Sequence, residues 1–323
     1  MTGDVVARPG PVGLRALRYA ADLTSLPVRA EDAPYGSCHL QAVTNLLAFS
    51  GVPHAPDRIG LSFGARRTAD AVLTGGDRWI RLAGEAFGVN LHEGHAEDAA
   101  AATAMEAEAL GAGAAVAAVV DSFHLPSPFT GRVHLAHCVL LVGSDDDAVT
   151  VIDPMNRPAP TRYPAAAWTD MRSAACVDRF RMFTCPGRAR RRPSAGELLR
   201  TIQTDIALHR DSDARELAGF VAWAERIAVL TFDVAGVAAE RTYLAALLGD
   251  LAAQHTSLRA IAESVASLAR RWYLLHTLGL AQPDATGPQR DRLVSLLRST
   301  ADADTRMAGV LCGIEPPPVP EEK

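Results

Sequence analysis

A short segment rich in proline and arginine, Pro186–Ser194, divides the sequence into two parts with different hydrophobic patterns. Before it, apolar runs typical of β-strands are interspersed with runs of helical period, and after it helical period dominates. Because the strands follow helices without regular alternation, the first part is predicted to be α+β rather than a βαβ repeat. The arginine cluster is interpreted as a solvated linker, with a docking patch for an acidic partner as the alternative. We therefore expect an α+β domain at residues 1–187, a linker at 188–193, an all-α helical domain at 194–315 and a disordered tail at 316–323.

The first part contains one well-marked helix and one well-marked hairpin. Ser37 is the expected N-cap of a helix that runs to about Ser50, and Gly51 followed by Pro53 gives a stop signal. An acidic turn at 144–147 joins two apolar runs and predicts the hairpin. The elements expected in the first part are helices at 76–87 and 96–110 and strands at 114–121, 138–143 and 148–152. Those expected in the second part are four or five amphipathic helices at about 194–210, 213–230, 235–254, 258–278 and 288–312.

The composition is that of an ordinary globular protein and excludes several classes of function. A net charge of -5 and a pI near 6.1 give no general basis for binding nucleic acid or an anionic membrane. No stretch approaches the roughly 20 apolar residues of a membrane-spanning helix, and the start of the chain lacks the apolar core of a secretory signal. The five cysteines form no C-x-x-C pair, so neither a disulfide framework nor a structural zinc site is expected. A cytoplasmic protein without a metal is the simplest expectation.

Cys38 follows directly after the expected N-cap, Ser37. The unpaired N–H groups and the macrodipole of a helix N-terminus favour a thiolate, and so lower the pKa of a cysteine at that position. The same N–H groups can stabilise the oxyanion of a tetrahedral intermediate. Cys38 is therefore the candidate nucleophile, and the alternative is that it is simply a small buried residue.

Two histidines compete for the role of the base. His137 immediately precedes an apolar strand run and Asp153 ends the strand across the hairpin, so the two are predicted to be near neighbours on antiparallel strands. The carboxylate would bond one ring nitrogen, fix the tautomer and leave the other nitrogen for Cys38. Alternatively, Asp153 and Pro154 only end the strand in a turn. His134, in the loop before the strand, is the alternative base, although His137 is favoured.

Three residues of the Cys38 helix are candidate substrate contacts. His39 is expected to point elsewhere on the helix than Cys38, in a structural or substrate-facing role. Gln41 and Asn45 lie on the Cys38 side, at i+3 and i+7, and either donate to substrate or satisfy neighbouring backbone groups. Elsewhere, His92 and His95 form no ligand set with a third residue and are interpreted as surface histidines.

The order of these segments resembles that of a known family, the butirosin-biosynthesis acyltransferases. The N-terminal domain of that family is a papain-like fold related to bacteriocin-processing peptidases. The resemblance extends from about residue 33 to about residue 280, and it depends on the order of the motifs rather than on any one of them. The matching segments are Gly36-Ser37-Cys38-His39 with the helix to Gly51, Leu61–Gly64, Val119–Pro126, His134-x-x-His137, Asp153-Pro154, Glu240–Leu248 and Leu268–Trp272.

The resemblance implies a papain-like cysteine domain followed by a helical domain, and a thiol that carries out acyl transfer. In that family the thiol takes an acyl or aminoacyl group from the phosphopantetheine thioester of a carrier protein and passes it to an amine, in antibiotic or other natural-product biosynthesis. Carried over to this chain, the resemblance makes Cys38 the nucleophile, His137 the base and Asp153 the orienting acid, with Asp121 a further candidate substrate contact. No bound cofactor is implied, because phosphopantetheine arrives on the donor. The expected partners are an acyl carrier protein or another thioester donor and a small-molecule amine; a homo-oligomer formed through the amphipathic helices is left open.

Two departures from the family pattern leave parts of the site undefined. Papain-like peptidases usually carry an upstream glutamine for the oxyanion hole, but Asp32–Ser37 contains none, so the hole would rest on the Cys38 N–H and an unidentified donor. The segment Ser62-Phe63-Gly64 is also less glycine-rich than the pattern, which leaves the substrate pocket open. Two other functions stay under consideration: a thioesterase or peptidase that uses water, and a non-catalytic binding protein of the same fold.

Overall fold

The structure, a computed structural model, describes residues 37–52, 60–69, 72–75, 78–126, 130–155, 157–187, 193–228, 230, 232–281 and 286–315. The chain divides into two compact units. The sheet unit consists of Met1–Asp32, Gln41–Pro53 and Val89–Ala189. The helical unit consists of Ala33–Leu40, His54–Gly88 and Arg190–Lys323. The linker expected at 188–193 lies outside the described residues except for Pro193, and so does the whole tail expected at 316–323.

The two units are not consecutive stretches of the chain. The last crossing between them, at Ala189 and Arg190, falls in the arginine-rich segment that divides the sequence. The helical unit also includes residues 33–40 and 54–88, which a single boundary at 187 leaves with the sheet. Helix α2 (Cys38–Phe49) therefore begins in the helical unit and continues in the sheet unit. The first residues of this helix therefore belong to the same unit as the C-terminal helices, which the linear order does not indicate.

The sheet unit is built on an antiparallel sheet with the strand order β3-β8-β4-β5-β6-β7. The strands are β3 (His92–Gly94), β4 (Val116–Asp121), β5 (Ala136–Ser144), β6 (Ala148–Asp153), β7 (Arg157–Pro164) and β8 (Met182–Thr184). β4 pairs with β5 up to Asp121↔Ala136, and β5 pairs with β6 up to Leu140↔Ile152. The predicted hairpin is therefore confirmed, whereas β3, β7 and β8 were not expected. The pairing places the end of β4, the start of β5 and the end of β6 side by side, at the same end of these neighbouring strands.

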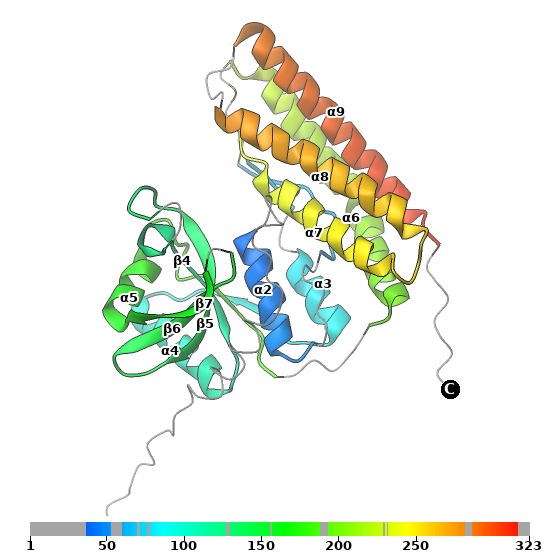
Figure 1. Cartoon of the computed structure of the whole chain (residues 1–323). Helices are drawn as coiled ribbons and strands as arrows, with labels where there is room; N and C mark the ends of the chain where they lie inside the picture. The colour runs from blue at the N-terminus through cyan, green and yellow to red at the C-terminus, as the bar shows by residue number, and fades with distance from the viewer. Residues whose placement is uncertain are drawn as a thin grey trace, which may run out of the picture. The chain divides into compact units, whose positions relative to one another are not determined.

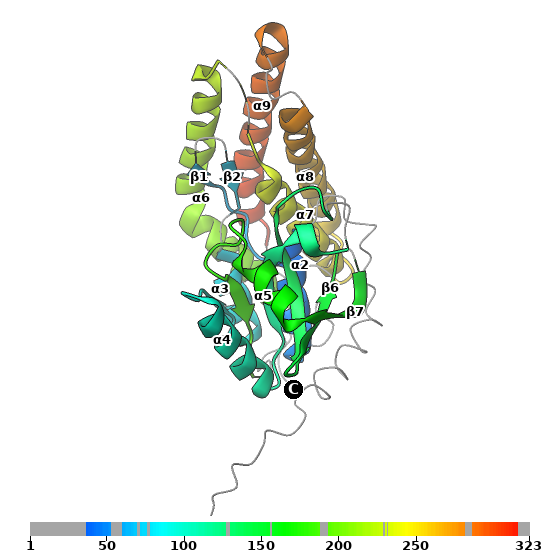
Figure 2. The ribbon, with the colours of Figure 1, turned by 90° about the vertical axis from the view of Figure 1, so that its left-hand side faces the viewer.

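Helices α4 (Ala99–Gly111) and α5 (Ala165–Ser173) pack on one face of this sheet (Figures 1 and 2). Alternate residues of β4 share a hydrophobic core with both helices, because side chains one position apart on a strand point to opposite faces. The core residues are Val116, Ala118 and Val120 on β4, Ala102 and Leu110 on α4, and Trp168 and Met171 on α5. An antiparallel sheet with helices packed on one face, without parallel βαβ units, confirms the α+β class.

A buried ion pair attaches α4 and α5 to the end of β4. Glu106 on α4 accepts hydrogen bonds from Arg172 Nε (3.0 Å) and Trp168 Nε1 (2.9 Å) on α5. Arg172 also donates to the carbonyl oxygens of Val119 (2.6 Å) and Phe180 (2.7 Å). Burial raises the pKa of Glu106 against the opposing effect of Arg172. The guanidinium thus binds the backbone of β4 at Val119, two residues before the strand ends. It also binds the carbonyl of Phe180, whose backbone lies in the left-handed region at φ 53°.

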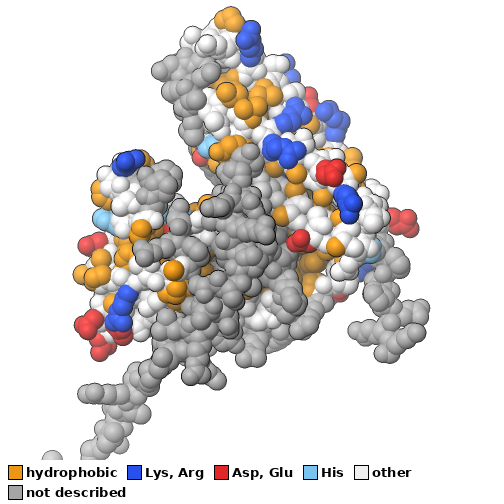
Figure 3. Space-filling model, viewed as in Figure 1, with side chains coloured by type: hydrophobic (Ala, Val, Ile, Leu, Met, Phe, Trp, Pro, Cys, Tyr) orange, Lys and Arg blue, Asp and Glu red, His pale blue; other side chains and the backbone are white. Residues whose placement is uncertain are grey.

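The described residues of the helical unit form a short helix, a two-stranded hairpin and four long helices. α6, α8 and α9 run side by side in both ribbon views (Figures 1 and 2). The elements are β1 (Arg66–Ala69), β2 (Val72–Thr74), α3 (Arg78–Phe87), α6 (Ala195–Arg226), α7 (Ala235–Leu251), α8 (Leu258–Ala281) and α9 (Gly287–Cys312). On the face shown in Figure 3, basic and acidic side chains are interspersed over these helices. No helix in the described part of the chain is both long and apolar enough to cross a membrane.

Helix α6 is one helix of 32 residues, so the prediction of two helices at 194–210 and 213–230 is wrong. The residues at the expected break, Asp211–Asp213, have low helix propensity. Asp213 nevertheless accepts a hydrogen bond from Arg78 Nη2 on α3 (2.7 Å). Contacts of this kind with the rest of the unit favour the helical conformation where local propensity does not.

A buried ionic network joins α7, α8 and α9. Arg241 on α7 makes two hydrogen bonds with Asp304 on α9, from Nε to Oδ2 (3.1 Å) and from Nη2 to Oδ1 (2.8 Å). Trp272 Nε1 on α8 donates to the same carboxylate (2.7 Å), and Arg241 Nη1 also donates to Glu240 (2.9 Å). Burial disfavours the charged guanidinium, but Asp304 and then Glu240 hold the pKa of Arg241 above its usual value. The positive charge of Arg241 is therefore compensated by carboxylates inside the helical unit.

The segment Ser62-Phe63-Gly64 is bound by this network. Ser62 Oγ and the Gly64 N–H (3.0 Å) donate to Glu240, while Gly64 O accepts from Arg241 Nη2 (2.8 Å). The guanidinium of Arg241 lies 3.6 Å from the centre of the Phe63 ring, at cation–π distance. Since Ser62 and Phe63 are both buried, this segment belongs to the core of the helical unit.

Candidate functional site

Cys38 is the first residue of α2, as predicted. The Leu40 N–H donates to Ser37 Oγ (3.4 Å), which confirms Ser37 as the N-cap of the helix. The Cys38 side chain is partly exposed, and its Sγ lies 3.5 Å from Nδ1 of His39. The expectation that His39 points away from Cys38 is therefore wrong, because its ring contacts the thiol. Residues 32–36, where an upstream glutamine is missing from the sequence, lie outside the described residues.

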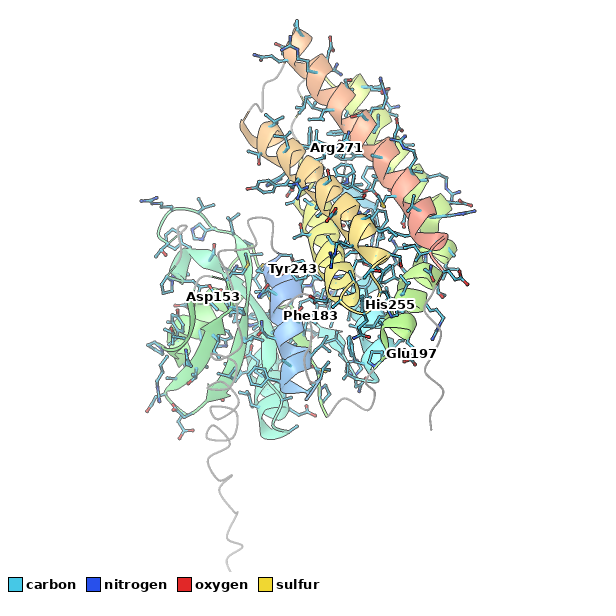
Figure 4. All side chains as sticks on the ribbon, turned by 45° about the vertical axis from the view of Figure 1, so that its right-hand side comes forward. Asp153, Phe183, Glu197, Tyr243, His255 and Arg271 are labelled. Carbon is cyan, nitrogen blue, oxygen red and sulfur yellow. The ribbon has the colours of Figure 1, made fainter. Side chains whose placement is uncertain are left out.

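The peptide group before Cys38 is held by a residue of α7. Tyr243 is buried, and its hydroxyl donates a hydrogen bond to Ser37 O (3.3 Å); Figure 4 labels this residue. The Ser37 carbonyl and the Cys38 N–H belong to the same planar peptide group, so a bond to one fixes the direction of the other. A hydrogen bond accepted by the carbonyl also polarises the N–H into a stronger donor. The N–H expected to face an oxyanion is thus oriented by the helical unit.

Asn45 follows the alternative in which it satisfies the backbone. Its side chain is buried, and its Nδ2 donates to the Gln41 carbonyl one turn earlier on α2 (2.8 Å). This bond lies within the helix and involves the backbone of Gln41. Nothing in the geometry of Asn45 calls for a substrate.

His137 and Asp153 are brought together where β5 begins and β6 ends, as the spacing predicted. Nε2 of His137 on β5 lies 3.0 Å from Oδ1 of Asp153, which ends β6 and is labelled in Figure 4. Continuing the register beyond Leu140↔Ile152 puts Asp153 opposite Val139, so His137 is its diagonal neighbour on the same face. The two side chains are only 12% and 8% exposed. The Met155 N–H also donates to Asp153 Oδ1 (3.0 Å), so this carboxylate both closes a turn and faces the imidazole.

His134 has a carboxylate of its own. Its Nδ1 shares a hydrogen bond of 2.6 Å with Oδ2 of Asp121, the last residue of β4. Asp121 is fully buried and also accepts from the Phe123 N–H (3.0 Å). Burial raises the pKa of Asp121, but the bonds from His134, Phe123 and Cys176 hold it below its usual value. The His134 ring is stacked on Phe123, with centroids 4.2 Å apart and planes 6° from parallel, and the side chain is 62% exposed.

Sequence reasoning missed that Asp121 is the partner of His134. All residues of β4 are buried, so alternation along the strand gave no signal that its last side chain has a polar neighbour. The available signal was the pairing of β4 with β5, since Asp121↔Ala136 places this carboxylate beside the residues that lead into β5. Cys176 was not singled out either. Burial raises the pKa of its thiol, and its bond to the Asp121 carboxylate raises it further.

Within the described ranges, no group of three or more His, Cys, Asp and Glu side chains is placed to hold a metal ion. What the fold and the site define is an α+β protein with a capped cysteine at a helix N-terminus and, in the sheet unit, the pairs His137–Asp153 and His134–Asp121. No protein-family model matches the chain, and no curated protein matches it. Its function has to be argued from the chemistry of these residues.

Proposed function

We propose that this protein is a cysteine-dependent acyltransferase, with a papain-like arrangement of nucleophile and base. The observation that carries the proposal is the 3.0 Å approach of His137 Nε2 to Asp153 Oδ1. A carboxylate at this distance stabilises the imidazolium that forms when the ring takes a proton. A base oriented in this way is what a cysteine nucleophile requires.

The surroundings of Cys38 support the same role. The thiol opens a capped helix, where the N–H groups of the first turn and the macrodipole favour a thiolate. We assign the Cys38 N–H as the oxyanion donor, and Tyr243 orients the peptide group that carries it. The thiol is partly exposed, as a group that must reach a substrate has to be.

The proposed reaction has two steps. In the first, the Cys38 thiolate attacks the thioester carbonyl of a phosphopantetheine arm, the carbon–sulfur bond to the arm breaks, and the His137 imidazolium protonates the departing thiolate. In the second, an amine attacks the acyl-enzyme, loses a proton to His137 as the amide bond forms, and releases the Cys38 thiolate. The donor is an acyl carrier protein or another thioester, and the acceptor is a small-molecule amine. Transfer is preferred to hydrolysis because the order of motifs resembles the butirosin-biosynthesis acyltransferases.

Trapping the acyl-enzyme tests the proposal directly. On incubation with a panel of acyl N-acetylcysteamine thioesters, we expect an acyl adduct that peptide mass spectrometry assigns to Cys38. Iodoacetamide near neutral pH is expected to alkylate Cys38 faster than Cys312 or Cys176. Cys176 is a suitable internal reference because burial and Asp121 raise the pKa of its thiol.

The other two functions give different results in the same experiments. A hydrolase would release free acid from a purified acyl-carrier thioester at the same rate with and without candidate amines. A binding protein would form no adduct and would be alkylated at Cys38 no faster than at Cys312. Either result would rule out acyl transfer.

Asp153→Asn is expected to lower kcat by about 10²–10⁴-fold while the fold is retained. The amide keeps an oxygen for the Met155 N–H but removes the charge that stabilises the His137 imidazolium. The measurement is single-turnover acylation beside a thermal melt of the same sample. Asp146→Asn, in the turn of the same hairpin, is the matched control and should retain the parent rate. An unchanged rate in Asp153→Asn would show that the pair serves only to end the strand.

A further inference from the structure

The side chains of Cys38 and His39 are in contact, although they are consecutive residues of one helix. On a regular helix, consecutive side chains point about 100° apart and do not face each other. Here Nδ1 of His39 nevertheless lies 3.5 Å from Sγ of Cys38. Because α2 begins at Cys38, no earlier turn of the same helix fills the space beside these residues, and the His39 ring can lie back against the thiol. The contact is therefore specific to this helix start.

The backbone that carries the two side chains is fixed within the helical unit. The Leu40 N–H donates to Ser37 Oγ (3.4 Å), and the Leu40 side chain is buried. The Tyr243 hydroxyl donates to the carbonyl of Ser37 (3.3 Å). Residues 33–40 and Tyr243 belong to the same compact unit. The contact between thiol and imidazole is therefore formed and supported without any residue of the sheet unit.

An imidazole this close to a thiol can take its proton and leave a thiolate beside an imidazolium. Each ion favours the other, because opposite charges attract strongly at contact distance. The macrodipole at the start of α2 favours the thiolate and disfavours the imidazolium, but it amounts to only about half an elementary charge, whereas the ring would carry a full one. Tyr243, which faces this turn from α7, is uncharged at neutral pH. The attraction within the pair therefore dominates.

We propose that His39 holds the proton of the Cys38 thiol, as an imidazolium paired with the thiolate. As a catalytic role, this rests on the proposed acyl transfer. The S–H bond of Cys38 breaks and an N–H bond forms on Nδ1 of His39, with no change in net charge. His39 keeps this proton while the thiolate attacks the thioester, and the pair forms again when the amide is released. His137 is then left to protonate the departing thiolate of the donor and to take the proton of the amine.

His39→Gln tests the pair through the pH dependence of Cys38 alkylation in the full-length protein. Gln can keep a hydrogen bond to the sulfur but cannot hold a positive charge. At about pH 6, iodoacetamide should alkylate Cys38 about 10–100-fold more slowly in the variant than in the parent. At about pH 10 the two rates should converge, because the thiol ionises there without a partner. Peptide mass spectrometry measures the adduct at residue 38. His39→Asn, with an amide close to the position of Nδ1, should show the same selective loss.

The control is His255→Gln, which replaces a partly buried histidine of the helical unit that follows α7 and is labelled in Figure 4. It should keep the parent pH profile. An unchanged profile in His39→Gln, or an equal loss of rate at every pH, would overturn the inference, since neither follows the ionisation of the thiol. Alkylation needs no acyl donor, so the two proposals fail separately. An acyl adduct on Cys38 with an unchanged alkylation profile in His39→Gln would remove the pair alone. A shifted profile with no acyl adduct in the parent would remove acyl transfer and leave the pair.

Discussion

Cys38→Ala is expected to reduce acyl transfer by about 10⁵-fold or more, the size of loss that removal of the nucleophile causes in triad enzymes. The reaction has no covalent intermediate without the thiolate, and the His137–Asp153 pair cannot substitute for it. Because Cys38 is only partly buried and opens its helix, the fold should be retained. The measurement is single-turnover transfer from a carrier thioester, beside a thermal melt.

The control for this prediction is Cys312→Ala on α9, whose partly exposed thiol lies 4.0 Å from the Gln203 carbonyl. This variant should keep the parent rate. If Cys38→Ala retained full activity and no adduct mapped to residue 38 in the parent, the nucleophile would be elsewhere. The proposed function would then be abandoned.

Arg241→Met is expected to lower the free energy of unfolding by about 3–5 kcal/mol. The substitution keeps much of the side-chain volume but leaves Asp304 and Glu240 buried without their counter-charge. It also removes the donor to Gly64 O and the cation over Phe63. Urea unfolding followed by tryptophan fluorescence would measure the loss, since Trp272 is bonded to the same Asp304 carboxylate.

Arg298→Met is the matched control for Arg241→Met. Arg298 is also bonded to a carboxylate, Glu225 (2.6 Å), but both side chains are exposed, and surface pairs contribute little. This variant should unfold at nearly the parent urea concentration. Similar small losses in the two variants would mean that the buried network does not stabilise the helical unit.

The parts of the site that were predictable depend on neighbours close in sequence. Ser37 caps the helix through a bond to Leu40, three residues later. His137 and Asp153 meet across one hairpin whose turn is marked by acidic residues. Capping and hairpin pairing each have a local chemical signature, so that signature was sufficient to place Cys38 at the start of its helix and His137 beside Asp153.

The parts that were missed depend on distant segments. Asp213, at the expected break in α6, is bonded to Arg78, which lies 135 positions earlier. Gly64 and Glu240, 176 positions apart, place the segment around Ser62 in the helical unit. Asp121 meets His134 only because β4 and β5 are paired, and neither residue carries a local mark of the other. No window of neighbouring residues contains both partners, so hydrophobic periodicity and helix or strand propensity could not predict these contacts.

The bond between Tyr243 and Ser37 has a consequence for the order of events during protein synthesis. The two residues are 206 positions apart, and a ribosome that adds 5–20 residues per second needs roughly 10–40 seconds to cover that interval. Throughout this time the peptide group before Cys38 lacks its hydrogen bond from Tyr243, because Tyr243 has not yet been synthesised, even though the residues that form α2 have been. The nascent chain therefore carries a cysteine whose proposed oxyanion donor is not yet oriented. The proposed chemistry becomes available only after α7 has been translated and folded.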